Sequence, residues 1–81
     1  MAMTLDGFDS GKSARIVAVE WSALAADEGK RLRALGIDQG ETISILHRGI
    51  FGGRDPIAVQ LGQMTIALRR THARAIEVEP L

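Results

Sequence analysis

The stretch IAVQLGQMTIAL, Ile57–Leu68, decides the fold because it predicts two short strands joined by a tight turn. Large aliphatic side chains occupy every second position across 57–61, which is the pattern of a strand with one buried face. Gly62-Gln63 then provides a two-residue hairpin signal. Across 64–68 the apolar residues again fall at every second position, starting at Met64, and we expect them to face the same core. The stretch therefore predicts an antiparallel hairpin.

Further strands are expected on either side of this hairpin. Their segments are rich in β-branched residues or alternate between apolar and polar side chains. They lie at 14–21, 41–48 and 75–79. A short helical turn is expected at 69–72. The first few residues and Pro80-Leu81 are expected to be loose ends, whereas Leu5 and Phe8 are expected to pack over the edge of the sheet.

The segment 22–36, SALAADEGKRLRALG, predicts a helix because Ala, Leu, Glu, Lys and Arg favour this conformation. Leu32 and Leu35 form the firm part of its apolar face, which Leu24 and Glu28 share at helical spacing.

The ends of this helix carry different signals. The N-cap is left open between Ser22 and Asp27. Gly36 is expected to end the helix in a left-handed conformation, with Ile37 folding back as its hydrophobic contact. The last turns contain cations that suit the helix dipole, namely Lys30, Arg31 and Arg33.

The order of elements is therefore strand, helix, three strands, short helical turn and strand. Because the connections between the last four strands are short, these strands are expected to be antiparallel. Five short strands with one inserted helix predict a mainly all-β fold, a small SH3-like barrel that leaves few edges exposed. With no repeat or linker in the sequence, residues 1–81 are expected to form a single domain.

The composition argues against several classes of protein. Ten Lys and Arg residues balance ten Asp and Glu residues, so the chain lacks the basic excess typical of a generic nucleic-acid binder. It has no cysteine, which rules out disulfides and thiolate chemistry and fits a reducing compartment. No apolar run approaches the roughly 20 residues that span a bilayer, and the start lacks the features of a secretory signal. We expect the protein to be cytoplasmic.

The segment FGGRDP, 51–56, has two interpretations, a phosphate-binding loop and a hairpin tip. A Walker loop needs a Lys-Ser or Lys-Thr pair running into a helix, so that backbone N–H groups meet the phosphate. Neither feature follows here, because the next element is a strand. The glycines and Pro56 instead predict a hairpin tip.

The two histidines and the basic run LRRTHAR, 68–74, are the other candidates for a site. Neither His47 nor His72 has a second imidazole or a thiolate nearby in the sequence, so a metal site is not expected. The run either docks an acidic partner or RNA, or forms a solvated turn. No interleaved aromatic residue supports base stacking.

Few aromatic residues are available for a groove that binds proline-rich peptides, since only Phe8, Trp21 and Phe51 are present. The chain also shows no recognisable set of nucleophile, base and orienting group. The sequence therefore predicts a non-enzymatic module without a cofactor.

Three segments together resemble the ferrous iron transport protein A (FeoA) family. They are RLRALGIDQGETISILHR at 31–48, FGGRDPIAVQL at 51–61 and IALRRTHARAIEVE at 66–79. The resemblance covers nearly the whole chain and rests on the order and spacing of these segments. It implies an SH3-like barrel with an inserted helix, and a small cytoplasmic accessory of bacterial Fe²⁺ uptake. The implied partner is the cytosolic part of the FeoB-type GTPase permease, with membrane contact only through that partner.

The chain departs from the family pattern at two places. Gln39 stands where the family often has proline, and Gly53-Arg54 lengthens the hairpin. A similar barrel is the C-terminal domain of iron-dependent repressors of the diphtheria-toxin-repressor (DtxR) type. The alternative is therefore a stand-alone regulatory domain that works on a transcription factor.

These observations lead to the hypothesis of a docking protein. The contacts are expected from exposed residues near the helix end and the hairpin, namely Lys30, Arg31, Arg33, Phe51, Arg54, Arg69 and Arg70. An inserted Arg54 would also suit activation of a GTPase, because an arginine stabilises charge on a transferring phosphoryl group. Nucleic-acid binding through 69–74 and metal sensing through His47 or His72 are the remaining alternatives.

Overall fold

The computed structural model describes residues 3–48 and 56–81, and for His47 and Arg48 the backbone only. Short 3₁₀ turns at Leu5–Gly7 and Trp21–Ala23 accompany the regular elements. The strands are β1 (Met3–Thr4), β2 (Ser13–Val19), β3 (Thr42–Arg48), β4 (Ile57–Leu61), β5 (Met64–Leu68) and β6 (Ile76–Pro80). The α-helices are α1 (Ala26–Ala34) and α2 (Arg70–Arg74).

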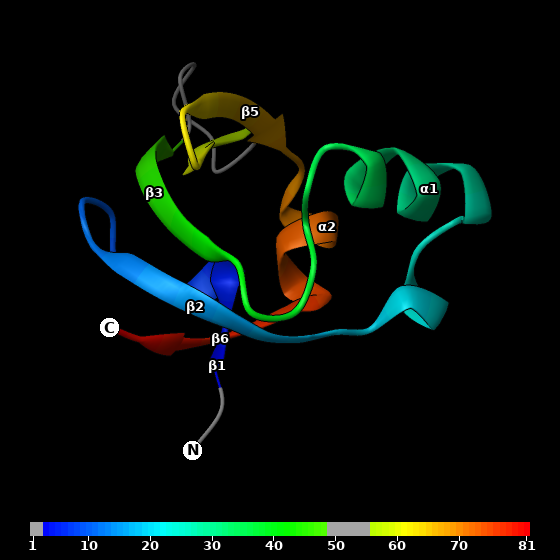
Figure 1. Cartoon of the computed structure of the whole chain (residues 1–81), viewed down its shortest axis with the longest axis horizontal. Coiled ribbons are helices and arrows are strands. Elements are labelled where there is room, and N and C mark those ends of the chain that lie inside the picture. Colours follow the sequence, from blue (N-terminus) through cyan, green and yellow to red (C-terminus); the bar gives the residue numbers. More distant parts are fainter. Residues whose placement is uncertain (1–2, 49–55) are drawn as a thin grey trace.

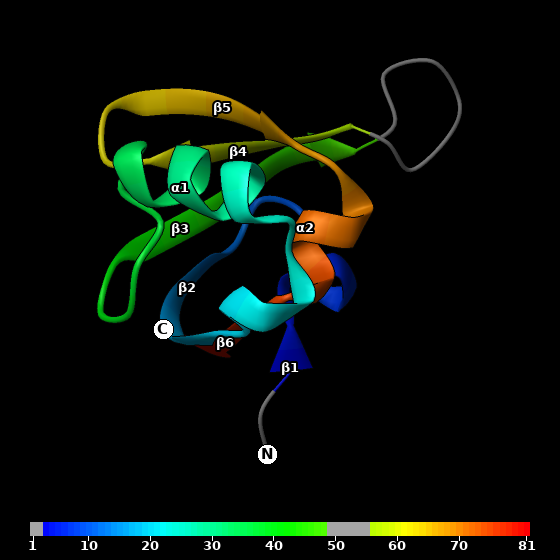
Figure 2. The ribbon, with the colours of Figure 1, turned by 90° about the vertical axis from the view of Figure 1, so that its right-hand side faces the viewer.

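The strands form one antiparallel sheet in the order β1-β6-β2-β3-β4-β5 (Figures 1 and 2). The register shifts between Ile16 and Ala18 where β2 pairs with β6, and between Ile45 and His47 where β3 pairs with β4. Such bulges bend a strand and increase its twist. Both shifts therefore help the sheet to curl around its core. The predicted mainly all-β, SH3-like class is confirmed.

The prediction of five strands is wrong by one, because the segment treated as a loose end forms β1. Met3 pairs with Val78 and Thr4 pairs with Glu77. A two-residue strand is too short to show any periodicity in the sequence, so only the pairing itself reveals it. Pro80 likewise belongs to β6 instead of a loose end.

The core is aliphatic and lies on the concave side of the sheet. Leu5 and Phe8 are buried beside β1, as expected. The buried face predicted for 57–61 is confirmed, since Ile57, Val59 and Leu61 are buried. The largest fully buried side chains are Leu5, Ile16, Leu32, Ile37, Ile43, Ile45, Ile57, Val59, Leu68, Ile76 and Val78.

The predicted hairpin is present, with Leu61 paired to Met64 across Gly62-Gln63. Gly62 has a φ of 62°, which a two-residue turn of this kind requires. Met64 does not face the core as expected, since it is 41% exposed. It follows the turn directly as the first residue of β5, which lies at one edge of the sheet.

Helix α1 is shorter than predicted and begins at Ala26. The chain leaves β2 at Val19 and makes a 3₁₀ turn from Trp21, so the predicted strand end at Trp21 is wrong and residues 22–25 precede the helix. The N-cap is Ala25, whose carbonyl accepts the N–H of Gly29 at 2.9 Å. Neither proposed N-cap residue fills that position, and Asp27 lies in the first turn instead.

The C-terminal end of α1 follows the prediction. Gly36 is left-handed, with a φ of 106°. The N–H of Ile37 then donates to the carbonyl oxygen of Leu32 at 3.0 Å, and the Ile37 side chain is fully buried. This arrangement satisfies backbone carbonyls that the helix end would otherwise leave open. Leu32 reaches the core, whereas Leu35 is half-buried.

Replacing Gly36 by alanine should destabilise the protein by about 1–2 kcal/mol, because an L-residue is strained in the left-handed region. A Cβ there would also lie 3.2 Å from Leu61 Cδ2. Thermal unfolding of Gly36→Ala and Gly29→Ala provides the comparison. Gly29 sits inside α1 with room for a Cβ, so that variant should gain about 0.5–1 kcal/mol. An unchanged midpoint for Gly36→Ala would contradict the assigned helix end.

Candidate functional site

The outer face of α1 carries a small pocket. Four residues share this face at helical spacing, namely Ala26, Gly29, Lys30 and Arg33. The 3₁₀ turn before the helix places Trp21 against the same face. A cavity of about 190 Å³ lies between them. We call it the α1 pocket, and its lining residues are Trp21, Ala25, Ala26, Gly29, Lys30 and Arg33.

Trp21 is the fixed wall of the α1 pocket. It is half-buried and packs against the hydrophobic core. The guanidinium carbon of Arg33 lies 4.4 Å from the centroid of its ring, which is the geometry of a cation–π contact. A Cβ built on Gly29 would lie 3.6 Å from Trp21 Cε3, so the helix backbone also approaches the ring closely. The aromatic side chain therefore positions Arg33 at the rim of the pocket.

The cations of α1 have no carboxylate partner within the described part of the chain. Lys30, Arg31 and Arg33 are all exposed, and none of them takes part in an ion pair there. Some other surface cations are paired, as Lys12 Nζ is with Asp9 Oδ2 at 3.6 Å. These three charges suit the C-terminal half of a helix. They leave a positive field on a protein whose formal net charge is zero.

The inner face of α1 is held by a buried histidine. His72 of α2 is 2% exposed, and its Nε2 lies 2.8 Å from Glu28 Oε2. An ionised carboxylate only accepts hydrogen bonds, so Nε2 is the donor in this pair. His72 Nδ1 is buried and has no partner among the described groups. The contact joins α1 to α2 across 44 residues of sequence.

The hydrogen bond from His72 lowers the pKa of Glu28 below the ordinary value for a glutamate. Desolvation opposes this effect, and smaller contributions that lower the pKa come from a backbone hydrogen bond with Ala25 and from the charge of Arg69. The sequence placed Glu28 on the apolar face of the helix. It gave no signal that His72 would be its partner, because the two residues meet only through the fold.

The basic run 68–74 does not form a single surface. His72 is buried, and Nε of Arg74 lies 3.8 Å from Oδ2 of Asp6. These two side chains are therefore already engaged within the domain. Arg69 is exposed ahead of α2, and Arg70 is half-buried at its start. Of the other expected contact residues, Lys30, Arg31 and Arg33 share α1, whereas Phe51 and Arg54 lie outside the described residues. The side chain of His47 lies outside them as well.

The α1 pocket has four lining residues that sequence reasoning missed, namely Trp21, Ala25, Ala26 and Gly29. Trp21 was assigned to a strand, whereas Ala25, Ala26 and Gly29 were treated only as part of the predicted helix. The helical spacing of Gly29, Lys30 and Arg33 was visible in the sequence. The 3₁₀ turn that brings Trp21 onto the same face was not.

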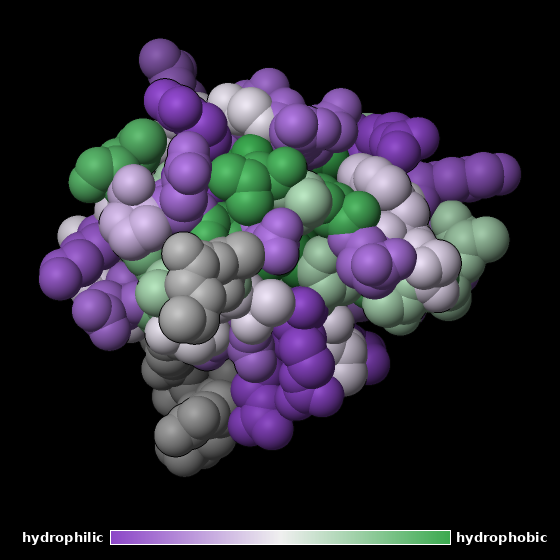
Figure 3. Space-filling model, turned by 90° about the horizontal axis from the view of Figure 1, so that it is seen from below, coloured by the Kyte–Doolittle hydropathy of each residue, from purple (hydrophilic) through white to green (hydrophobic). Residues whose placement is uncertain are grey.

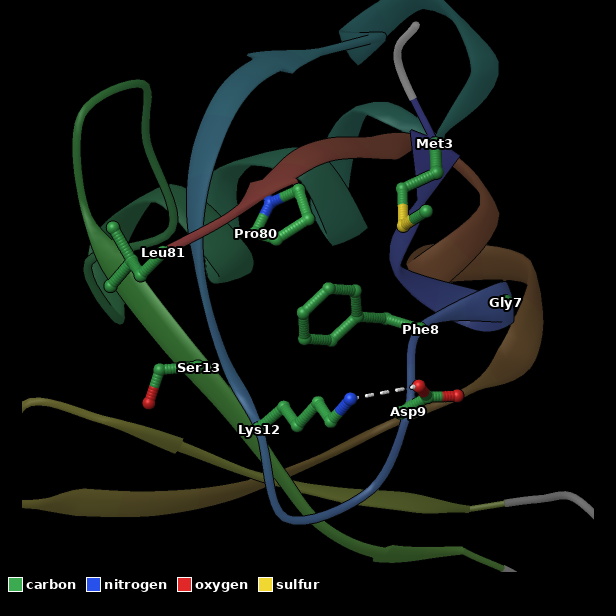
Figure 4. A pocket seen from close by; sticks show the side chains of 8 residues that line it. All are labelled: Met3, Gly7, Phe8, Asp9, Lys12, Ser13, Pro80 and Leu81. Atoms are coloured by element: carbon green, nitrogen blue, oxygen red, sulfur yellow. Dashed lines mark ion pairs between the residues drawn. The ribbon is translucent and has the colours of Figure 1, made fainter.

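A larger cavity, of about 480 Å³, is shown in Figure 4. None of the α1 cations is among its lining residues. Its apolar side chains come from both ends of the chain, and the ion pair of Lys12 and Asp9 lies at one side. Its lining residues are Met3, Gly7, Phe8, Asp9, Lys12, Ser13, Pro80 and Leu81. Figure 3 shows the molecule from below the view of Figure 1. On this face hydrophobic residues gather near the middle, and hydrophilic side chains occupy much of the edge. None of the expected contact residues lines this cavity.

Within residues 3–48 and 56–81, no group of three or more His, Asp or Glu side chains is placed to hold a metal ion. In the same ranges, no helix has the length and apolar character that crossing a membrane requires.

The family model and the similar solved structures point to the same family, FeoA. The model of the FeoA domain matches residues 3–80. The iron(II) transport protein A of Clostridium thermocellum has a TM-score of 0.83 at 32% identity, over 98% of this chain and 46% of that one. A FeoA from Stenotrophomonas maltophilia complexed with zinc, described as a prokaryotic SH3 domain protein, has a TM-score of 0.77 at 34% identity, over 95% of this chain and 89% of that one.

A manganese-dependent transcriptional repressor has a TM-score of 0.80 at 24% identity, over 99% of this chain and 42% of that one. At this identity the likeness shows the fold alone. No curated protein matches the chain.

The contact between Glu28 and His72 should make stability depend on pH in the acid range. Because the folded-state pKa of Glu28 is depressed, its contribution is fully present above the unfolded value of about 4.3 and is lost as the pH falls through the lower folded value. Glu28→Gln should therefore flatten the acid limb of a plot of denaturant midpoint against pH. Glu41→Gln makes the same charge change away from α1 and α2, and controls for net charge. Equal slopes in wild type and Glu28→Gln would contradict the assignment.

Proposed function

Because the chain belongs to the FeoA family, we propose that it is a non-enzymatic accessory of ferrous iron uptake that docks on the cytosolic part of a FeoB-type GTPase permease. The family match over residues 3–80 supports a role connected with ferrous iron transport. A cytoplasmic location, at the inner face of the membrane when the partner is bound, is part of the same proposal.

The observation that carries the docking role is the unpaired positive charge on α1 next to a half-buried tryptophan. Tryptophan and arginine are enriched among the residues that dominate binding energy at protein interfaces. Charged residues without an internal partner also steer an oppositely charged partner during encounter. Trp21 and Arg33 are in contact, and Lys30 lies beside them on the same helical face.

The attachment of α1 to the rest of the domain supports this role. Leu32 is buried, and the Glu28–His72 hydrogen bond ties the helix to α2. The basic face is therefore held on a rigid support, which limits the entropy lost when a partner binds. The buried histidine contributes to packing in this proposal and is assigned no chemical step.

The proposed contact set also includes residues away from α1. Arg70 is the first residue of α2 and Arg69 precedes it, and the Glu28–His72 contact links this helix to α1. Phe51 and Arg54 complete the set of proposed contact residues. Activation of the partner's GTPase by Arg54 is a separate hypothesis. Unchanged GTP turnover at saturating protein would eliminate that hypothesis.

The fold-level likeness to a manganese-dependent repressor keeps regulation of a transcription factor as the alternative. The cation-rich face of α1 favours neither a repressor nor a permease by itself. The family match favours the transport role.

Docking predicts that purified protein binds the isolated cytosolic domain of the permease in calorimetry. The double variant Lys30→Glu/Arg33→Glu should weaken this binding at least about tenfold, because it reverses two charges at the interface. Arg15→Glu reverses a charge on β2, outside the proposed contacts, and should bind as the wild type does. The proposal fails if no binding is seen and if deletion of the gene leaves Fe²⁺ uptake unchanged.

A further inference from the structure

We infer that the α1 pocket receives the side-chain carboxylate of an acidic segment of a protein partner. The inference rests on the proposed docking function and assigns the chemistry of one contact within it. The carboxylate would lie between Lys30 and Arg33, with its aliphatic stem on the wall formed by Trp21 and Gly29.

The size and lining of the pocket match one small side chain. Its volume of about 190 Å³ is below the roughly 300–1,000 Å³ that is typical of sites for drug-sized ligands and cofactors. Its lining combines the small residues Ala25, Ala26 and Gly29 with Trp21 and the two cations. An arginine can bind a carboxylate through two parallel hydrogen bonds, which gives the contact direction as well as strength. Neither cation has a competing carboxylate within the described residues.

Gly29 is an independent indication that the space matters. A glycine inside a helix costs about 1 kcal/mol relative to alanine. The backbone does not need it, because Gly29 is not among the glycines with positive φ. Packing does not need it either, since a Cβ would make only an ordinary contact of 3.6 Å with Trp21. The remaining effect of the missing side chain is to keep the wall of the α1 pocket open.

A protein carboxylate fits these observations better than a nucleic acid does. Single-stranded nucleic acids bind by stacking bases on open aromatic faces along a basic groove. One face of Trp21 is covered by Arg33, and the ring also packs on α1 and the core. The balanced overall charge further limits binding to a polyanion.

The test uses the fluorescence of Trp21, which is the only tryptophan of the chain. The intact protein is titrated with a blocked synthetic peptide, Leu-Glu-Ala-Glu-Leu, and with its counterpart in which both Glu are Gln. We expect a saturable change with the acidic peptide and at least about a tenfold weaker response with the amide counterpart. No response to the acidic peptide, or equal responses to both, would overturn the inference. Tighter binding of oligouridylate or of phosphatidylglycerol vesicles than of the peptide would also overturn it.

Variants separate the pocket from a general positive field. Arg33→Glu and Lys30→Glu should each weaken peptide binding about tenfold or more. Arg31→Glu removes the same charge from the same helix but lies outside the pocket, so its effect should be only about two- to threefold. Equal losses for Arg31→Glu and Arg33→Glu would show a diffuse field and overturn the inference. Arg15→Glu should have no effect.

Gly29→Ala supplies the sharpest comparison, because stability and binding should change in opposite directions. The variant should unfold at a higher temperature than the wild type and still bind the peptide at least about fivefold more weakly. Unfolding cannot then account for the loss, and full binding by Gly29→Ala would overturn the inference.

In parallel, binding to the permease domain separates the two proposals. If that domain binds all pocket variants as it binds the wild type, the docking function stands and this pocket assignment falls. If only the peptide binds, the permease role falls.

Discussion

The burial of Leu32 fixes the orientation of α1, and the outer surface of the protein depends on that orientation. Leu32 is fully enclosed in the core. At about 100° per residue, Lys30 must then point away from the core, and Arg33 must lie on the flank next to Trp21. Truncating a buried leucine costs about 2–5 kcal/mol, which is large for a domain of this size. A single apolar contact thus determines where the positive charge is displayed.

Local sequence signals predicted the parts of the fold that depend on neighbouring residues. The hairpin at 57–68 followed from alternation and a two-residue turn, and both are present. The end of α1 at Gly36 followed from the conformational freedom of glycine, and its φ of 106° agrees. Both features are decided within a few residues along the chain, so a single sequence contains the information needed.

Features decided by distant residues were missed. β1 exists only because β6 offers it a partner, and two residues carry no pattern of their own. The helix begins after Ala25 without a side-chain cap, so the usual signal of a polar N-cap was misleading. The candidate site shows the same division. Lys30 and Arg33 were expected as contacts from their exposed positions, but the wall formed by Trp21 required the observed path of the chain between β2 and α1.

The pairing of β1 with β6 also determines how this domain can be joined to others. In this antiparallel pair Met3 lies opposite Val78, so the point where the chain enters the sheet lies beside the last strand. Such a unit can be carried within a longer polypeptide without crossing over its own sheet. Two of the similar structures are in fact much longer chains, of which this one spans 46% and 42%. The short strand thus places the entry of the chain into the barrel next to its last strand.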